Sequence, residues 1–222
     1  MPTVPDALRP RRLAAELVDL VRHAPGTMVW LGILAITAIT TSRMSPEHLD
    51  RVLGHRSTNL ANLAHDPIRV LITSLMVFDG GTWFGYAVLY LVFHAPVERR
   101  IGTRRWLTVA LGAHVLATYV SQGFVALGIR SGWASPVVAH ALDYGVSYAL
   151  AGVQGVATYL LPRRWRWPYA LVMCLVYLVP FAADGITFTS IGHVTALAIG
   201  FCCVRFTRPR LRVEPPLSGT VA

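Results

Sequence analysis

Long apolar runs separated by short clusters of arginine recur along most of the chain, and they limit the possible folds more than any other feature. Over half of the 222 residues are hydrophobic (54%), the mean hydropathy is +0.51, and 14% of the residues are charged. Soluble domains carry about 25% charged residues. The runs are continuously apolar and do not alternate, which excludes a membrane-spanning barrel. The pattern predicts an all-α protein that crosses a bilayer several times.

Six apolar segments are near the roughly 20 residues that a spanning helix needs. They are residues 27–42, 80–97, 106–129, 137–161, 167–183 and 187–205. We therefore expect a cytoplasmic segment (1–26), a six-helix membrane domain (27–206) and a disordered cytoplasmic tail (207–222). Within the first segment, Leu8 to His23 has the apolar spacing of one helix face and should lie on the membrane surface. Five tryptophans fall near predicted span ends, where indole rings favour the interface: Trp30, Trp83, Trp106, Trp133 and Trp167.

The arginines predict the orientation of the chain in the membrane. All 20 basic residues are arginine; fifteen precede the first span or lie on alternate loops after it, and five lie on the other side. The positive-inside rule then puts both termini in the cytoplasm, and we expect a multi-pass protein of the plasma membrane. Because these arginines flank apolar spans and do not gather on a soluble face, a nucleic-acid partner is not expected. We expect the lipid bilayer to surround the six predicted spans.

A serine and a histidine lie at similar depth in two predicted spans. Ser147 in the fourth and His193 in the sixth would each sit on the order of 10–15 Å below the outer surface. A neutral imidazole beside a serine hydroxyl is the general-base arrangement that activates the nucleophile. Gly152 and Gly200 would let the two helices approach closely. Alone, a serine in a membrane helix usually bonds to a carbonyl of its own helix, whereas a histidine at depth is costly and more often functional.

Asp143 is a second polar outlier in the fourth span, and it shares a helix face with His140 and Ser147. Its carboxylate could pair with His140, orient a base or hold a proton; we favour contact with water near the outer mouth. The histidines and the three cysteines show no metal-ligand spacing, so we expect neither a metal nor another cofactor.

Four short segments resemble the rhomboid family of intramembrane serine proteases. Gly145-Val146-Ser147 is similar to the family's Gly-x-Ser motif, and the helix of His193 is similar to its histidine helix. Ile68-Arg69 resembles an element of the first external loop, and Glu98 with Gly102 resembles the Glu-x-x-x-Gly that closes the second helix. The resemblance implies a six-transmembrane-helix rhomboid-like bundle with Ser147 as nucleophile and His193 as base. It implies structural roles for Arg69, Glu98, Gly102, Gly152 and Gly200.

The chain departs from the family pattern around the candidate dyad. The second-helix histidine and asparagine that help to hold the oxyanion correspond to Thr82 and Tyr86. The glycine that normally follows the serine corresponds to Tyr148, and the tyrosine that stacks on the histidine one turn after the serine corresponds to Ala151. The sequence thus predicts a nucleophile and a base, with Gly145 beside the nucleophile. It also predicts an oxyanion hole that lacks its usual side-chain donors.

Four functional classes therefore stay open. The first is an intramembrane serine peptidase that cleaves transmembrane substrates with a Ser147–His193 dyad. The second is a catalytically inactive relative that binds transmembrane helices of client proteins. A small transporter and a structural membrane subunit are the others. No internal repeat is visible, which disfavours the transporter.

The orientation is testable with one cysteine. In a background without the native cysteines, His55→Cys should react with an impermeant maleimide applied to intact cells, because residues 43–68 are predicted to lie outside. Labelling that occurs only after lysis would contradict the orientation and the outer placement of Ser147.

Overall fold

The computed structural model describes residues 18–77, 83–183 and 187–207, and within these residues it contains helices and no strand. The all-α class is confirmed. Thr82, most of the predicted surface helix and nearly all of the predicted tail lie outside the described residues. Two described helical segments are long and apolar enough to cross a membrane, Thr103–Arg130 and Phe188–Thr207, and Pro25–Thr41 is a shorter apolar helix.

The helices follow the order expected from the apolar runs. After a helical stretch at residues 18–23, they are in chain order α2 (Pro25–Thr41), α3 (Pro46–Arg56), α4 (Leu60–His65), α5 (Pro67–Thr73), α6 (Trp83–Leu89), η3 (Tyr90–His94), α7 (Ala95–Ile101), α8 (Thr103–Arg130), η4 (Pro136–His140), α9 (Gly145–Ala157), η5 (Thr158–Leu160), α10 (Arg163–Ala183), α11 (Phe188–Cys202) and η6 (Cys203–Thr207). Each predicted span overlaps one helical unit. The fourth begins later than predicted: residues 137–144 form a short 3-10 helix and an extended segment, and α9 starts at Gly145.

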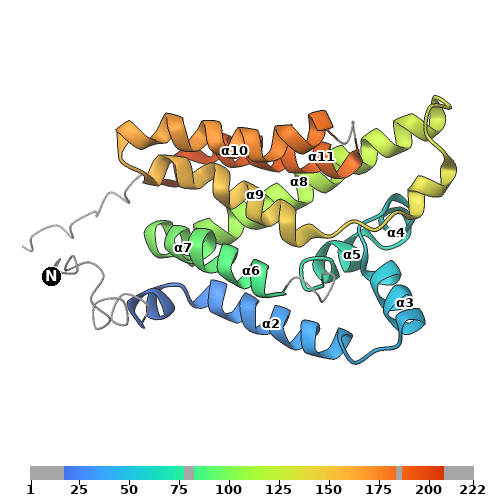
Figure 1. Cartoon of the computed structure of the whole chain (residues 1–222), viewed down its shortest axis with the longest axis horizontal. Coiled ribbons are helices and arrows are strands. Elements are labelled where there is room, and N and C mark those ends of the chain that lie inside the picture. The colour runs from blue at the N-terminus through green and yellow to red at the C-terminus, as the bar shows by residue number, and fades with distance from the viewer. Residues whose placement is uncertain (1–17, 78–82, 184–186, 208–222) are drawn as a thin grey trace, which may run out of the picture.

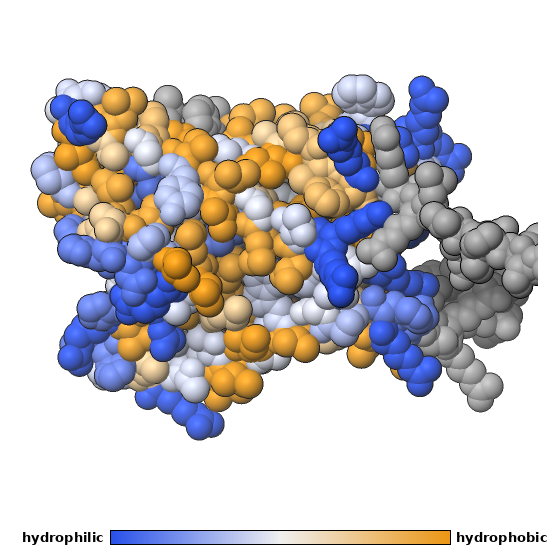
Figure 2. All heavy atoms as spheres, turned by 180° about the vertical axis from the view of Figure 1, so that it is seen from behind, coloured by the Kyte–Doolittle hydropathy of each residue, from blue (hydrophilic) through white to orange (hydrophobic). Residues whose placement is uncertain are grey.

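Helices α8, α9 and α11 pack against one another in the centre of the bundle, with α10 outside α11 and with α2, α6 and α7 on the other side (Figure 1). Every residue of α9 except Ser147 and Ala157 is buried, because its small and β-branched side chains allow neighbours to approach from all sides. Helices α3, α4 and α5 gather at one end of the molecule, and the α9–α10 connection lies at the other (Figure 1). Figure 2 shows apolar side chains over the middle of one face and hydrophilic ones toward both ends.

Helices α6 and α7 form one unit with a π-helical turn, η3, between them. Pro96 has no backbone N–H and cannot continue the regular hydrogen-bond ladder, and the N–H of Ala95 donates to the carbonyl of Tyr90, five residues back. The unit ends at Gly102, whose φ of +83° disfavours any residue with a side chain. The chain can therefore turn directly into α8.

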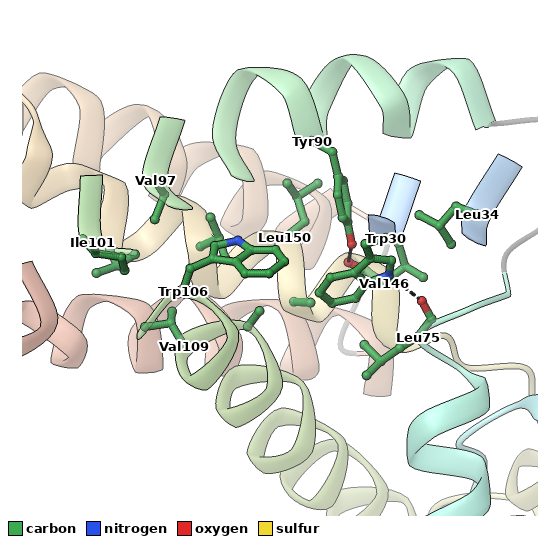
Figure 3. Close-up of a cluster of buried hydrophobic side chains, with 14 residues drawn as sticks. Trp30, Leu34, Leu75, Tyr90, Val97, Ile101, Trp106, Val109, Val146 and Leu150 are labelled. Atoms are coloured by element: carbon green, nitrogen blue, oxygen red, sulfur yellow. Dashed lines mark hydrogen bonds between the residues drawn. The ribbon is translucent and has the colours of Figure 1, made fainter. Parts of the chain in front are cut away.

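Trp30, Tyr90 and Trp106 lie in the core between α2, η3 and α8 (Figure 3), and the buried ring of His94 packs against all three. The Tyr90 ring stacks on His94 at 3.8 Å, and Trp30 meets both rings edge-on. The indole N–H of Trp30 donates to the Leu75 carbonyl at 2.8 Å, and that of Trp106 donates to His94 Nδ1 at 3.2 Å. Trp30 and Trp106 are therefore buried inside the protein, with each indole N–H satisfied there.

Glu98 joins α2, α7 and α8 at the end of the bundle that carries the α9–α10 connection. Its fully buried carboxylate accepts hydrogen bonds from the backbone N–H groups of Gly26 and Thr27, at 2.8 and 2.7 Å. It also accepts from the hydroxyls of Thr27 and Thr103, both at 2.7 Å. The carboxylate thus caps the amino end of α2, where the helix dipole favours a negative charge.

Replacing this carboxylate should destabilise the protein strongly. In Glu98→Gln one oxygen becomes an NH₂ group that faces two donors, so we expect a loss of about 2–3 kcal/mol, measured as a lower thermal unfolding midpoint in detergent. Glu47→Gln, on exposed α3, is the matched control and should change stability by less than about 0.5 kcal/mol. Equal shifts for the two variants would contradict the role given to Glu98.

Candidate functional site

Ser147 lies in the first turn of α9 and is half-buried. Its hydroxyl donates to the carbonyl of Tyr144 at 3.4 Å, within its own helical turn, and the hydroxyl of Tyr86 on α6 lies beside it. Among the described residues, no hydrogen bond joins Ser147 to His193. In this structure the serine makes the helix-backbone contact that is usual for serine in membrane helices.

His193 lies in the second turn of α11, and its ring packs between two tyrosines. The centroid of the Tyr148 ring is 5.1 Å away at an interplanar angle of 78°, and that of Tyr177 is 5.3 Å away at 30°. Gly192 makes room for Tyr148, since a Cβ at that position would lie 2.3 Å from Cζ of the tyrosine. The side of α9 that faces the histidine is therefore the side of Tyr148, and Ser147 points toward α6.

Tyr177 also connects α10 to α9. Its hydroxyl donates to the side-chain carbonyl of Gln154, and the hydroxyl of Tyr169 donates to the Gln154 backbone carbonyl at 3.0 Å. Sequence reasoning missed Tyr177 and Gln154, because neither belongs to a motif and both lie within apolar runs. A glutamine in the middle of a predicted span was the available signal, since a buried amide needs partners.

Asp143 is buried, with a relative exposure of 2%, so the expected contact with water is wrong. Its carboxylate accepts from Gln122 Nε2 at 3.0 Å and lies next to the hydroxyl of Tyr148. Its N–H donates to Ser57 Oγ at 2.8 Å, and its carbonyl accepts from the N–H of Thr58 at 3.0 Å. Asp143 therefore holds the segment between α3 and α4 against the start of α9.

His140 and Arg69 lie outside this group. His140 is exposed, its carbonyl accepts a hydrogen bond of 3.4 Å from Asn59 Nδ2, and in the described part of the chain no hydrogen bond joins it to Asp143. Arg69 pairs with Asp66 at 2.9 Å at the start of α5, where both side chains are about half exposed. Neither side chain is positioned by the contacts that hold Ser147 or His193.

His114 on α8 is a further buried contact that the family pattern did not single out. Its Nε2 atom lies 3.0 Å from the Leu71 carbonyl, so this nitrogen carries the proton, and the Thr118 hydroxyl lies 3.4 Å from Nδ1. A Cβ on Gly145 would lie 2.2 Å from the His114 ring. Gly145 therefore lets the start of α9 approach α8 and is packed against a histidine.

Glycines bring α9 and α11 into direct backbone contact. A Cβ added to Gly200 would lie 2.1 Å from the Gly152 carbonyl oxygen, and one added to Gly155 would lie 2.5 Å from that of Leu197. This close approach sets the spacing between Tyr148 and His193. The residues that the structure describes contain no group of three or more histidine, cysteine, aspartate or glutamate side chains placed to hold a metal ion.

Comparison with known proteins identifies one family. Residues 19–213 match the family model described as "rhomboid-like protein". No curated protein and no solved structure matches the chain.

The glycine contact can be tested by adding one methyl group. Gly200→Ala should destabilise the protein by about 1–3 kcal/mol, because the backbones of α9 and α11 must separate. Gly123→Ala, at an open position of α8 where a Cβ meets nothing within 4 Å, is the matched control and should be neutral or stabilising by up to about 1 kcal/mol. Thermal unfolding in detergent measures both, and a neutral Gly200→Ala would contradict the tight contact.

Proposed function

The chain belongs to the rhomboid-like protein family, and from this premise we propose that it is a membrane protein that binds transmembrane helices of client proteins without cleaving them. The packing of Tyr148 against His193 is the observation that carries the proposal. This contact bears directly on which residue, at or just before the start of α9, stands at the position of the family's nucleophile.

In the rhomboid proteases, the tyrosine on the histidine follows the serine by one helical turn, and a glycine follows the serine directly. If Tyr148 is that tyrosine, the nucleophile position is four residues earlier, at Tyr144, and the next residue is Gly145. Both family features are then present in one register. With Ser147 as the nucleophile, the same two positions hold Tyr148 and Ala151. The Ser147 register keeps Gly145 and Ser147 as the Gly-x-Ser motif, whereas the Tyr144 register keeps the following glycine and the tyrosine on the histidine. The contact between Tyr148 and His193 favours the second register, with a tyrosine in place of the nucleophile.

The surroundings of Ser147 support the same conclusion. A general base must come within hydrogen-bond reach of the proton that it removes, yet the His193 ring packs between Tyr148 and Tyr177. The Tyr86 hydroxyl lies beside Ser147, on the helix from which an oxyanion donor is expected. Both side chains are thus held by packing contacts with tyrosines. This arrangement favours a binding role over acyl transfer, because it does not bring the base to the serine.

The proposal includes a six-span topology in the plasma membrane. The spans would be α2, the α6–α7 unit, α8, α9 with η5, α10, and α11 with η6, with both termini in the cytoplasm. The start of α10 and the junction of α7 and α8 lie at one end of the bundle (Figure 1), and both are rich in arginine. A shared arginine-rich end is the arrangement that the positive-inside rule favours.

A groove between α7 and the start of α10 is the surface that we assign to the client helix. Its volume is about 290 Å³, and its walls are almost entirely apolar. It is lined by Val92, Phe93, Pro96, Val97, Arg100, Ala157, Leu160, Leu161 and Tyr169. The groove lets apolar side chains of a guest helix replace lipid and gain packing contacts.

Two measurements test this function. The purified protein should not react with a fluorophosphonate probe under conditions in which an active serine hydrolase does. A photo-crosslinker at Val92 should capture a co-expressed single-span model helix, and capture should persist in Ser147→Ala and His193→Ala. A crosslinker at Val120 is the matched control, since this valine is similarly exposed (48% against 55%) but lies on α8, away from the groove.

The outcomes separate the two main hypotheses. Reaction of Ser147 with the probe, or cleavage of the model helix that Ser147→Ala abolishes, would overturn the binding role and restore the peptidase. Equal capture from Val92 and Val120 would contradict the groove as the client site.

A further inference from the structure

A second cavity lies on the other side of η5, where this turn and the start of α10 meet the end of α11. Its volume is about 390 Å³. It is lined by Thr158, Tyr159, Arg163, Arg166, Trp167, Ala170, Cys174 and Phe201. None of these residues contributes to the Ser147–His193 region, and none lines the proposed client groove.

The lining is polar at one end and apolar at the other. Arg163 and Arg166 stand in the first turn of α10, whereas Ala170 and Cys174 follow one and two turns further along the same helix. Phe201 of α11 adds another apolar wall, and among the described residues no carboxylate lines the cavity. The ligand that fits is an amphiphile with a negatively charged head and an apolar chain.

The two arginines differ in how they are held. Arg166 donates to the carbonyls of Leu161 and Tyr159, at 3.1 and 3.0 Å, which fixes its guanidinium at the wall. Arg163 is exposed and has no hydrogen bond or ion pair among the described residues. One arginine is therefore preorganised, and the other keeps all its donors for an anion.

Thr158 adds a buried hydroxyl without a partner to the residues of this cavity. The residue is 5% exposed, and its hydroxyl has no hydrogen-bond partner in the described part of the chain. The carbonyl one turn earlier, that of Gln154, already accepts from the Tyr169 hydroxyl at 3.0 Å. A buried hydroxyl without a partner costs about 1–3 kcal/mol, and this one belongs to a residue that lines the cavity.

We propose that this cavity binds an anionic phospholipid of the cytoplasmic leaflet. The phosphate lies between Arg163 and Arg166, an oxygen of the head group or ester accepts from Thr158, and one acyl chain runs along Ala170 and Cys174. Trp167, which is 84% exposed, lies at the mouth, where an indole suits the head-group region. The apolar depth favours a lipid over a soluble phosphate. The proposal rests on the cytoplasmic placement of this end and is independent of client binding.

Native mass spectrometry of the full-length protein in detergent tests the site, with phosphatidylglycerol and phosphatidylcholine of identical acyl chains as probes. We expect tighter binding of phosphatidylglycerol. Arg163→Gln should weaken that binding about fivefold, and Thr158→Val should weaken it several-fold while leaving the unfolding midpoint unchanged or higher. Arg164→Gln removes the same charge from the adjacent exposed residue, which does not line the cavity, and should have little effect.

Other results would overturn the proposal. Equal losses for Arg163→Gln and Arg164→Gln would indicate attraction to a diffuse basic surface. Equal binding of the two lipids would remove the role of the anionic head. Glycerol phosphate that competes as well as the lipid would indicate a soluble anion. If phosphatidylglycerol is preferred but both Arg163→Gln and Thr158→Val bind it as tightly as the wild type, the lipid binds elsewhere.

Discussion

The backbones of α9 and α11 touch where Gly152 and Gly155 meet Gly200, with no side chain between them. In a bilayer, lipid chains are as apolar as leucine, so helix association depends on close packing, and small residues permit it. This contact fixes the rotation of α9 about its axis. The rotation turns Tyr148 toward His193 and Ser147 toward Tyr86. The packing of three glycines therefore decides which residue of α9 faces the histidine.

Two buried carboxylates hold the opposite ends of the bundle. Glu98 accepts four hydrogen bonds from neutral donors at the junction of α2, α7 and α8. Asp143 accepts from Gln122 and ties the loop after α3 to the start of α9 through Ser57 and Thr58. A buried carboxylate is costly unless its oxygens are satisfied. Each carboxylate therefore fixes how the helices and loops around it pack. Asp143 in particular holds in place the turn that contains Tyr144.

The proposed client groove and the proposed lipid cavity flank the same short turn, η5. From the groove, Arg100 donates to the Leu160 carbonyl at 3.2 Å. From the cavity, Arg166 donates to the carbonyls of Tyr159 and Leu161. Three consecutive carbonyls at the end of a buried helix are thereby satisfied by arginine, which explains how an irregular turn is accommodated beside apolar segments. The arginines at this end therefore have a structural role in holding the turn.

The sequence by itself determined the all-α class, the order of the helical units and the rhomboid-like family, because apolar length and short motifs are local properties. It also singled out Glu98, Gly102, Gly152 and Gly200, because a buried carboxylate needs hydrogen-bond donors and a glycine permits a close helix contact or a positive φ wherever it lies. It did not determine that α9 begins at Gly145, that Asp143 is buried, or that Tyr148 faces the histidine. Helical periodicity specifies which residues share a face but not which neighbour that face meets. Only the packing of α8, α9 and α11 decided that question, and with it which residue of α9 stands opposite His193.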